Sequence, residues 1–404
     1  MRDRALYYEL WQELNKHKPM IFISGPRQSG KTTLAKQIAA KIPTHIYTNW
    51  DVITDRKRIH QTPYFFEHLD RLDNNTPLII FDEIHKYRFW KRYLKGVYDR
   101  YSETYRFLVL GSGRLDVFQK GGDSLAGRYF QAHIFPLTIA ELANRQQPFD
   151  VFWKNPLHIP NSPLPLREWE ALKHLTGFPE PFFNASPENY ERWSNTYAHQ
   201  LIREDIRDLT QIKNIDTTEA LYFLLPSKVG SLLSIAGMAR DLQVSFGAVK
   251  QWLAAFERFY LIFRLSPWVK KISRTIRKEQ KLYLMDYGQI TDPAARLENM
   301  TALELMRATS HWNDRGLGRF ALHYIRDKEQ REVDFLITNK NIPLLLVETK
   351  LGDTQLSPSL KRFQATFHIP AVQLVDDKDC RRVIKNGSQD ILIITAADWL
   401  SLLP

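Results

Sequence analysis

The sequence predicts an α/β protein in several domains, with a parallel sheet in its first third. Its 404 residues exceed what one compact core usually holds, so two or three domains are expected. Over residues 1–147, short apolar runs alternate with helical patterns, which is the rhythm of an α/β domain. The middle of the chain has helical periodicity, and strand-like runs return after Ser266 together with one further helix.

Composition limits the class of protein. Hydrophobic content of 44% and charged content of 25% are typical of a soluble globular chain. No apolar run approaches the roughly 18 residues that a membrane helix needs, and the charged start "MRDRALYYELWQEL" lacks the apolar core of a signal peptide. The single cysteine, Cys380, excludes an intramolecular disulfide and suits a reducing compartment. We expect a cytoplasmic protein without a membrane partner, and its net charge of +11 favours polyanionic partners.

The expected elements follow in order along the chain. The runs "MIFISG", "HIYTNW", "LIIFDE" and "FLVLGSG" predict buried parallel strands. The stretch "TTLAKQIAAKIP" predicts the helix after the first strand, ending before Pro43. Eight of the 21 prolines lie between Pro148 and Pro187, so an irregular connector is expected over residues 148–190.

A phosphate-binding loop is predicted at "GPRQSGKT", between the first strand and its helix. The glycines let the backbone curl so that successive N–H groups and the helix N-terminus point at an anion. Lys31 would reach the β- and γ-phosphates, and the hydroxyl of Thr32 would bind Mg²⁺. The residues expected to hold ATP are Gly25, Pro26, Arg27, Gln28, Ser29, Gly30, Lys31, Thr32, Thr33 and Asp82.

An acidic pair ends the apolar stretch "PLIIFDE". An aspartate at the carboxyl end of a buried parallel strand can hold the Mg²⁺ shell, which is the role predicted for Asp82. The adjacent Glu83 can polarise the water that attacks the γ-phosphate. The pair therefore favours an ATP hydrolase.

Two later residues are candidates for catalysis at the same site. Ser112 ends the strand "FLVLGSG", which could lie between the two motifs and sense the γ-phosphate. Arg128 in "SLAGR" could stabilise transition-state charge in its own or a neighbouring subunit. A structural ion pair is the alternative for Arg128.

The chain resembles the prokaryotic AAA-type ATP-binding proteins that carry a C-terminal domain of unknown function. The resemblance rests on "GPRQSGKTTL", "FDEIHKYRFW", "LGSGRLDVF", "SLAGRYF", "TGFPE", "LIREDI" and "MDYG", which span almost the whole chain. It implies that the strand carrying Glu83 is separated from the phosphate-loop strand. Members usually have a run of serines where this chain has only Ser112, and a glutamine is common at the position of His85.

A basic module is predicted between Lys228 and Lys281. This segment contains 11 lysines and arginines and 3 acidic residues, which gives it a net charge of +8. The stretch "SIAGMARDLQVSFGAVKQWLAAFERF" has the order helix, turn, helix, with Ser245 placed to cap the second helix. The following "WVKKISRTIRKEQKLYLMD" predicts a basic two-stranded ribbon. A helix–turn–helix followed by such a ribbon is a winged helix, which the resemblance also implies. The residues expected to contact DNA are Lys250, Gln251, Arg258, Lys270, Lys271, Arg274 and Arg277. A solvated face or a protein-binding winged helix is the alternative.

A charged hairpin is predicted at "EVDFLITNKNIPLLLVETK". Antiparallel pairing would bring Asp334 opposite Glu348, with Lys350 on the same face as Glu348. Two such carboxylates can hold Mg²⁺ or Mn²⁺, and a lysine can orient an attacking water. The arrangement resembles the PD-(D/E)XK nuclease fold, in which a glutamate from a preceding helix joins the metal site; Glu298 is that candidate and Glu304 a weaker one.

The predicted organisation is an AAA-type ATPase domain (1–147), the proline-rich connector (148–190), a winged-helix domain (191–288) and a nuclease-like domain (289–404). The predicted function is ATP binding and hydrolysis with Mg²⁺, binding of double-stranded DNA, and metal-dependent cutting of nucleic acid. The alternative is a nucleotide-controlled switch for DNA or protein binding without nuclease activity. A homo-oligomer is compatible with Arg128 acting between subunits.

Overall fold

The protein forms two compact units, residues 1–135 and residues 136–404. The computed structural model describes residues 3–70, 75–111, 113, 125–207, 212, 214–270, 279–352, 354–387 and 389–404. The four-part division expected from the sequence is finer than these two units and stays a prediction.

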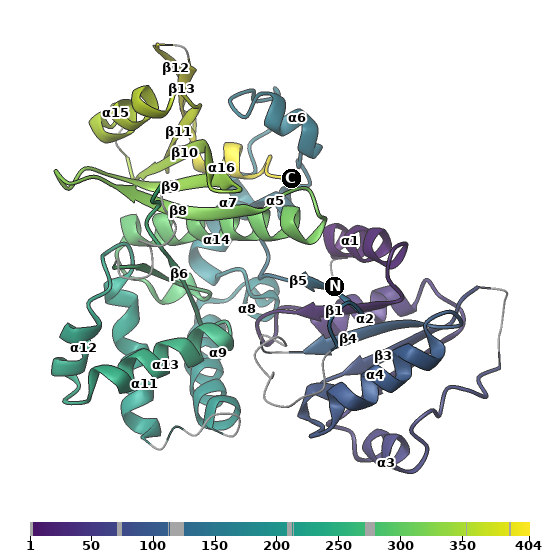
Figure 1. The fold of residues 1–404 in the computed structure, drawn as a ribbon. Coiled ribbons are helices and arrows are strands. Elements are labelled where there is room, and N and C mark those ends of the chain that lie inside the picture. The colour runs from purple at the N-terminus through teal and green to yellow at the C-terminus, as the bar shows by residue number, and fades with distance from the viewer. Residues whose placement is uncertain are drawn as a thin grey trace. The chain divides into compact units, whose positions relative to one another are not determined.

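The first unit is built on a five-stranded sheet with the order β2-β3-β4-β1-β5, in which every strand pair is parallel (Figure 1). The four strands expected from the sequence are confirmed as parallel strands, but β2 is an edge strand in which only Thr48 is buried. Strand β5 is an additional edge strand. Because β4 lies between β3 and β1, the acidic strand is separated from the phosphate-loop strand, as the resemblance implied. The elements are α1 (Ala5–Asn15), β1 (Met20–Ser24), α2 (Lys31–Ala39), β2 (His45–Asn49), α3 (Ile53–Gln61), β3 (Leu78–Asp82), the 3₁₀ helix η1 (Ile84–Lys86), α4 (Trp90–Tyr101), β4 (Arg106–Gly111) and β5 (Phe130–His133).

Apolar side chains cover both faces of this sheet. Residues alternate across a strand, so Ile21 and Ile23 of β1 pack with α1 and α2 in one cluster, while Phe22 packs in a second cluster with α4. The central strands are therefore apolar at nearly every position, and β1 and β3 end in the polar residues Ser24 and Asp82 at their carboxyl ends. The sheet thus forms the middle layer between two layers of helices. The predicted ATP site lies at the carboxyl ends of its central strands.

The second unit contains a six-stranded mixed sheet with the order β12-β13-β11-β10-β9-β8 and a two-stranded sheet, β6-β7. The helices up to β6 are α5 (Ile139–Ala143), α6 (Phe149–Lys154), α7 (Leu166–Leu175), α8 (Pro179–Asn184), α9 (Pro187–Gln200), the π-helix η3 (Leu201–Ile206), α11 (Ile215–Leu224), the 3₁₀ helix η4 (Leu225–Lys228), α12 (Ile235–Asp241) and α13 (Phe246–Arg258). The remaining elements are β6 (Ile262–Leu265), β7 (Lys281–Leu284), the 3₁₀ helix η6 (Tyr287–Gln289), α14 (Pro293–Asp314), β8 (Phe320–Arg326), β9 (Glu332–Asn339), β10 (Ile342–Lys350), α15 (Pro358–Phe367), β11 (Ala371–Val375), β12 (Arg381–Asn386), β13 (Gln389–Thr395) and α16 (Ala396–Leu400).

The proline-dense stretch is less irregular than expected. Residues 148–190 contain the helices α6, α7 and α8 and the start of α9. Pro179 and Pro187 stand in the first turns of α8 and α9, where a missing N–H costs no intrahelical hydrogen bond. The expectation of a wholly irregular connector was therefore wrong, because proline blocks a helix interior but not a helix start.

The expected helix–turn–helix is present as α12 and α13. The hydroxyl of Ser245 accepts a 3.1 Å hydrogen bond from the N–H of Ala248, so this residue caps α13 as predicted. Strands β6 (Ile262–Leu265) and β7 (Lys281–Leu284) form an antiparallel pair. Most of the expected basic ribbon, residues 271–278, lies outside the described residues. Within the described part of the chain, no helix is both long and apolar enough to cross a bilayer.

Candidate nucleotide site and a second charged cluster

The phosphate loop joins β1 to α2. Gly30 has φ of 95° at the N-terminus of α2, a left-handed conformation that favours glycine. A side chain at Gly25 would place its Cβ 2.2 Å from the carbonyl oxygen of Ile134, so the loop packs too closely there for any other residue. The ammonium of Lys31 donates to the carbonyls of Gly25, at 3.0 Å, and Pro26, at 2.5 Å, and so lies across the loop.

Thr32 and Asp82 meet at the end of the sheet. The hydroxyl of Thr32 donates a 2.9 Å hydrogen bond to Asp82 Oδ2, and the hydroxyl of Tyr47 donates to the same oxygen at 2.6 Å. Asp82 is only 3% exposed, and burial raises its pKa against the opposing effect of these two donors. A buried carboxylate beside a hydroxyl is a set of hard oxygen ligands, so Thr32 and Asp82 fit a magnesium ion.

Glu83 follows Asp82 with φ of 55°, a left-handed conformation that non-glycine residues seldom adopt. Its Oε2 lies 3.6 Å from His85 Nε2 and 3.4 Å from the ammonium of Lys86. His85, the position at which the resemblance implied a glutamine, is therefore within ion-pair distance of the candidate base. Strained backbone at a candidate catalytic residue is common in enzymes, although the catalytic role of Glu83 stays a prediction.

The other two catalytic candidates of this unit have different outcomes. Ser112 lies outside the described residues. Arg128 donates to Asp99 of α4 at 2.7 and 3.1 Å, in a two-bond ion pair. This is the contact expected from the alternative reading of Arg128, and its role in catalysis stays a prediction.

In the second unit, three of the predicted DNA-contacting residues lie on α13 and are exposed: Lys250, Gln251 and Arg258. Lys270 is also exposed, beyond the end of β6. Lys271, Arg274 and Arg277 lie outside the described residues.

The charged hairpin forms as expected. Strands β9 and β10 are antiparallel, and their paired residues run from Ile342 and Asn339 to Val347 and Phe335, one step before Glu348 and Asp334. Lys340 and Asn341 form the turn with φ of 51° and 64°, the left-handed pair typical of a two-residue hairpin. The ammonium of Lys350 lies 2.9 Å from Glu348 Oε1, which confirms that these two side chains share a face.

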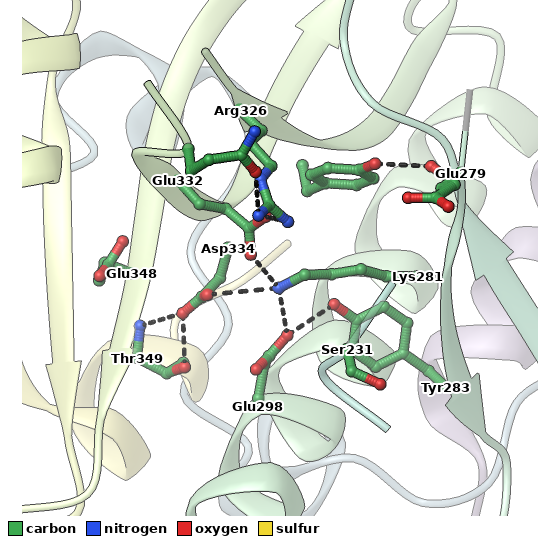
Figure 2. Close-up of polar contacts among 12 residues, drawn as sticks. Ser231, Glu279, Lys281, Tyr283, Glu298, Arg326, Glu332, Asp334, Glu348 and Thr349 are labelled. Atoms are coloured by element: carbon green, nitrogen blue, oxygen red, sulfur yellow. Dashed lines mark hydrogen bonds and ion pairs between the residues drawn. The ribbon is translucent and has the colours of Figure 1, made fainter. Parts of the chain in front are cut away.

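The ammonium that reaches Asp334 comes from a different residue. Lys281 of β7 lies 3.0 Å from Glu298, 2.6 Å from Glu332 and 3.7 Å from Asp334 (Figure 2). Burial lowers the pKa of Lys281, but the three carboxylates outweigh that effect and raise it above the ordinary value.

The expected metal set of Glu298, Asp334 and Glu348 is not assembled. In the part of the chain that the structure describes, no three acidic, histidine or cysteine side chains are placed to hold a metal ion. Glu298 and Asp334 face the Lys281 ammonium instead, and burial followed by the charge of Asp334 raises the pKa values of Glu298 and Glu348 to about 7. The weaker candidate, Glu304, is turned to another place, where its Oε1 accepts a 2.5 Å hydrogen bond from the N–H of Ile139.

Two family models match separate parts of the chain. Residues 17–143 match the model of a family described as an AAA domain. The first unit has the fold of an AAA-type P-loop domain. Residues 167–295 match a domain of unknown function (DUF8612).

Similar proteins cover most of the chain. Two uncharacterized proteins, Mb2031c of Mycobacterium bovis and Rv2008c of Mycobacterium tuberculosis, are each 24% identical over 365 residues, which is 88% of this chain and 76% of theirs. Among solved structures, the Walker-type ATPase PABY2304 of Pyrococcus abyssi aligns with a TM-score of 0.45 and 16% identity, over 72% of this chain and 95% of that one.

The sequence patterns missed several residues at the two sites. In the AAA-type domain, Arg4 is 3% exposed and donates to the carbonyls of Ser29 in the phosphate loop, at 2.7 Å, and Phe135, at 2.8 Å. Neither Arg4 nor Tyr47 belongs to a local motif. In the second unit, Glu332 could have been found, because it stands two positions before Asp334 on the same face of a strand. Lys281 carried a weaker signal as a charge at the start of the apolar run "KLYL".

Proposed function

We propose that the AAA-type domain hydrolyses ATP with Mg²⁺ at the loop Gly25–Thr32. The observation that carries this proposal is the hydrogen bond between Thr32 and Asp82, which brings the two predicted magnesium ligands together across the sheet. When bound, Mg²⁺ neutralises charge on the β- and γ-phosphates. The ammonium of Lys31 would exchange the loop carbonyls for phosphate oxygens, and Glu83 would orient the attacking water and accept its proton.

Replacement of Lys31 tests this proposal. Lys31→Ala removes a charge-assisted hydrogen bond to phosphate, worth about 1.5 to 3 kcal/mol, so ATP affinity should fall at least ~10-fold in a calorimetric titration with magnesium. The exposed Lys378, also changed to alanine, is the matched control in the second unit. Unchanged ATP affinity in Lys31→Ala would refute the assignment of the site.

We further propose that the second unit binds double-stranded DNA through α13 and that the nucleotide controls this binding. Support comes from the helix–turn–helix geometry, the exposed Lys250 and Arg258, and the excess of positive charge in residues 228–281. The experiment is the ATP turnover rate with and without duplex DNA. Stimulation by DNA supports this function, and indifference to DNA would favour control of a protein partner.

Metal-dependent cutting is the second candidate function. Its support is the antiparallel pair β9 and β10, which carries Asp334 and Glu348, with the Lys350 ammonium 2.9 Å from Glu348. We derive no step through a metal here, because Lys281 faces two of the three expected ligands. Incubation with single- and double-stranded DNA and RNA in Mg²⁺ or Mn²⁺ tests cutting. Cleavage that persists in both Asp334→Ala and Lys350→Ala would show that these residues do not carry it.

A further inference from the structure

A buried lysine stands at the centre of the carboxylates of the second unit. The side chain of Lys281 is 2% exposed, and its ammonium lies within 4 Å of oxygens of Glu298, Glu332 and Asp334, which come from α14 and β9. Figure 2 shows the three carboxylates directed at this one nitrogen. A charge this deeply buried is stable only when it is paired, so the cluster and the lysine require each other.

The backbone of Lys281 is fixed on both sides. It pairs with Leu265 of β6 and forms a bridge with Leu232, and the N–H of Leu233 donates to the carbonyl of Gln280 at 2.8 Å. The position of the ammonium is therefore set by the sheet β6-β7.

The carboxylates are fixed as firmly. Glu298 Oε1 accepts a 2.8 Å hydrogen bond from Tyr283, and Glu298 Oε2 packs against Gly230, where a Cβ would lie 2.9 Å away. Asp334 Oδ2 accepts from the N–H of Thr349 at 2.9 Å and from its hydroxyl at 2.8 Å. Carboxylates held toward one point are what a divalent cation needs, but here an ammonium takes that point.

One carboxylate oxygen on β10, the strand next to β9, is buried without a hydrogen bond from the described residues. Glu348 Oε2 is buried and has no hydrogen-bond partner within the described residues, while the charge of Asp334 acts on the same carboxylate. Glu348 Oε1 lies 2.9 Å from the ammonium of Lys350, so the oxygen atoms that the Lys281 ammonium engages are those of Glu298, Glu332 and Asp334. An ammonium and a divalent ion repel each other strongly at such separations in a buried site.

We propose that Lys281 is a resident cation that competes with divalent metal for Glu298 and Asp334, and that it keeps Mg²⁺ and Mn²⁺ out of the nuclease-like sheet. The ammonium is supplied by β7, the second strand after the helix–turn–helix. This inference involves neither ATP nor DNA.

The test is a titration of the nucleotide-free full-length chain with Mn²⁺. Electron paramagnetic resonance measures the concentration of free Mn²⁺ at each step. Lys281→Met should bind one Mn²⁺ per chain at least tenfold more tightly than the unaltered protein. Lys281→Arg keeps the charge and should behave as the unaltered protein. Adding Asp334→Asn to Lys281→Met should abolish the new site, which places it at this cluster. Lys378→Met, which removes an exposed lysine of the same unit, is the matched control and should have no effect.

Circular dichroism establishes that each variant is folded, and Lys281→Gln replaces Lys281→Met if the latter does not fold. Equal Mn²⁺ affinity of the unaltered protein and the neutral variant would overturn the proposal, whether both bind or neither does. A tight site in the unaltered protein that Asp334→Asn removes would overturn it as well. The phosphate loop is the same in every variant, so its own metal binding cancels in the comparison, and loss of ATP binding would not affect the result.

Discussion

The hydroxyl of Thr32 lies 2.9 Å from Asp82 Oδ2, although 50 residues separate them in the chain. Thr32 is the second residue of α2, after the phosphate loop, and Asp82 ends β3, two positions away from β1 in the sheet. Their contact brings together the two residues proposed to hold Mg²⁺, and the roles of the residues around them can be tested one by one.

Replacement of Glu83 should separate binding from turnover. Glu83→Gln removes the proton acceptor but keeps the shape of the side chain, so ATP turnover should fall at least ~100-fold while nucleotide affinity stays the same. Phosphate release and titration with a fluorescent nucleotide measure the two quantities. Turnover at the original rate in this variant would contradict the role of Glu83 as base.

Replacement of Tyr47 should lower the stability of the protein when no metal or nucleotide is bound. Tyr47→Phe deletes one of the two hydroxyl donors to the buried Asp82, which should cost about 1–3 kcal/mol of stability. Urea unfolding without nucleotide measures this loss. Saturating MgATP should reduce this difference in stability between the two proteins, because the bound cation would then pair with the Asp82 carboxylate. A loss of stability that MgATP leaves unchanged would separate Tyr47 from the metal site.

Arg4 should support the phosphate loop from outside it. Arg4→Met removes two hydrogen bonds from a charged donor, each worth about 1.5–3 kcal/mol, and leaves the Ser29 carbonyl without this donor. We expect lower stability by a few kcal/mol and weaker ATP binding, measured by thermal unfolding and calorimetry. Lys16→Met changes an exposed cation of the same unit and should alter neither quantity. ATP affinity that survives the loss of Arg4 would mean that the loop holds its shape alone.

DNA binding should be electrostatic and should depend on α13. Reversing the charges of Lys250 and Arg258 together should weaken duplex binding and lower the slope of log affinity against log salt by about 2, since each phosphate contact contributes about 0.9. Fluorescence anisotropy over a range of salt concentrations measures both.

Lys361→Glu with Arg362→Glu makes the same charge change on α15, where both residues are exposed. If this control pair lowers the slope equally, net charge rather than α13 governs binding. Binding that ignores salt would exclude the proposed interface altogether.

Glu304 should make the stability of the second unit depend on pH. Burial, although opposed by the charge of Arg307, raises its pKa to about 8. A carboxyl whose pKa is higher in the folded state binds a proton more readily there, so stability should fall as pH rises toward 8. Against an unfolded pKa of about 4.3, the total loss is at most about 5 kcal/mol.

Glu304→Gln cannot ionise and should remove this part of the pH dependence. Thermal unfolding between pH 5 and pH 9 compares the slopes of the two proteins. Glu180→Gln, at an exposed position of α8, should leave the original slope in place. Parallel slopes for the unaltered protein and Glu304→Gln would show that Glu304 does not titrate differently on folding.

The sequence alone determined the features that depend on neighbours in the chain. The loop Gly25–Thr32, the four parallel strands, the cap at Ser245 and the antiparallel hairpin that carries Asp334 and Glu348 all follow from local spacing and strand alternation. Proline spacing was a poorer guide, because helices α6 to α8 accommodate the prolines at or outside their first turns.

Only the tertiary structure decided which distant charges meet. Arg4 reaches Ser29, Tyr47 reaches Asp82, and Lys281 reaches Glu298 and Asp334 through contacts that no periodicity records. The physical reason is burial: a charged or polar group removed from water must find a partner wherever the fold brings one. The identity of that partner is a property of packing rather than of sequence order.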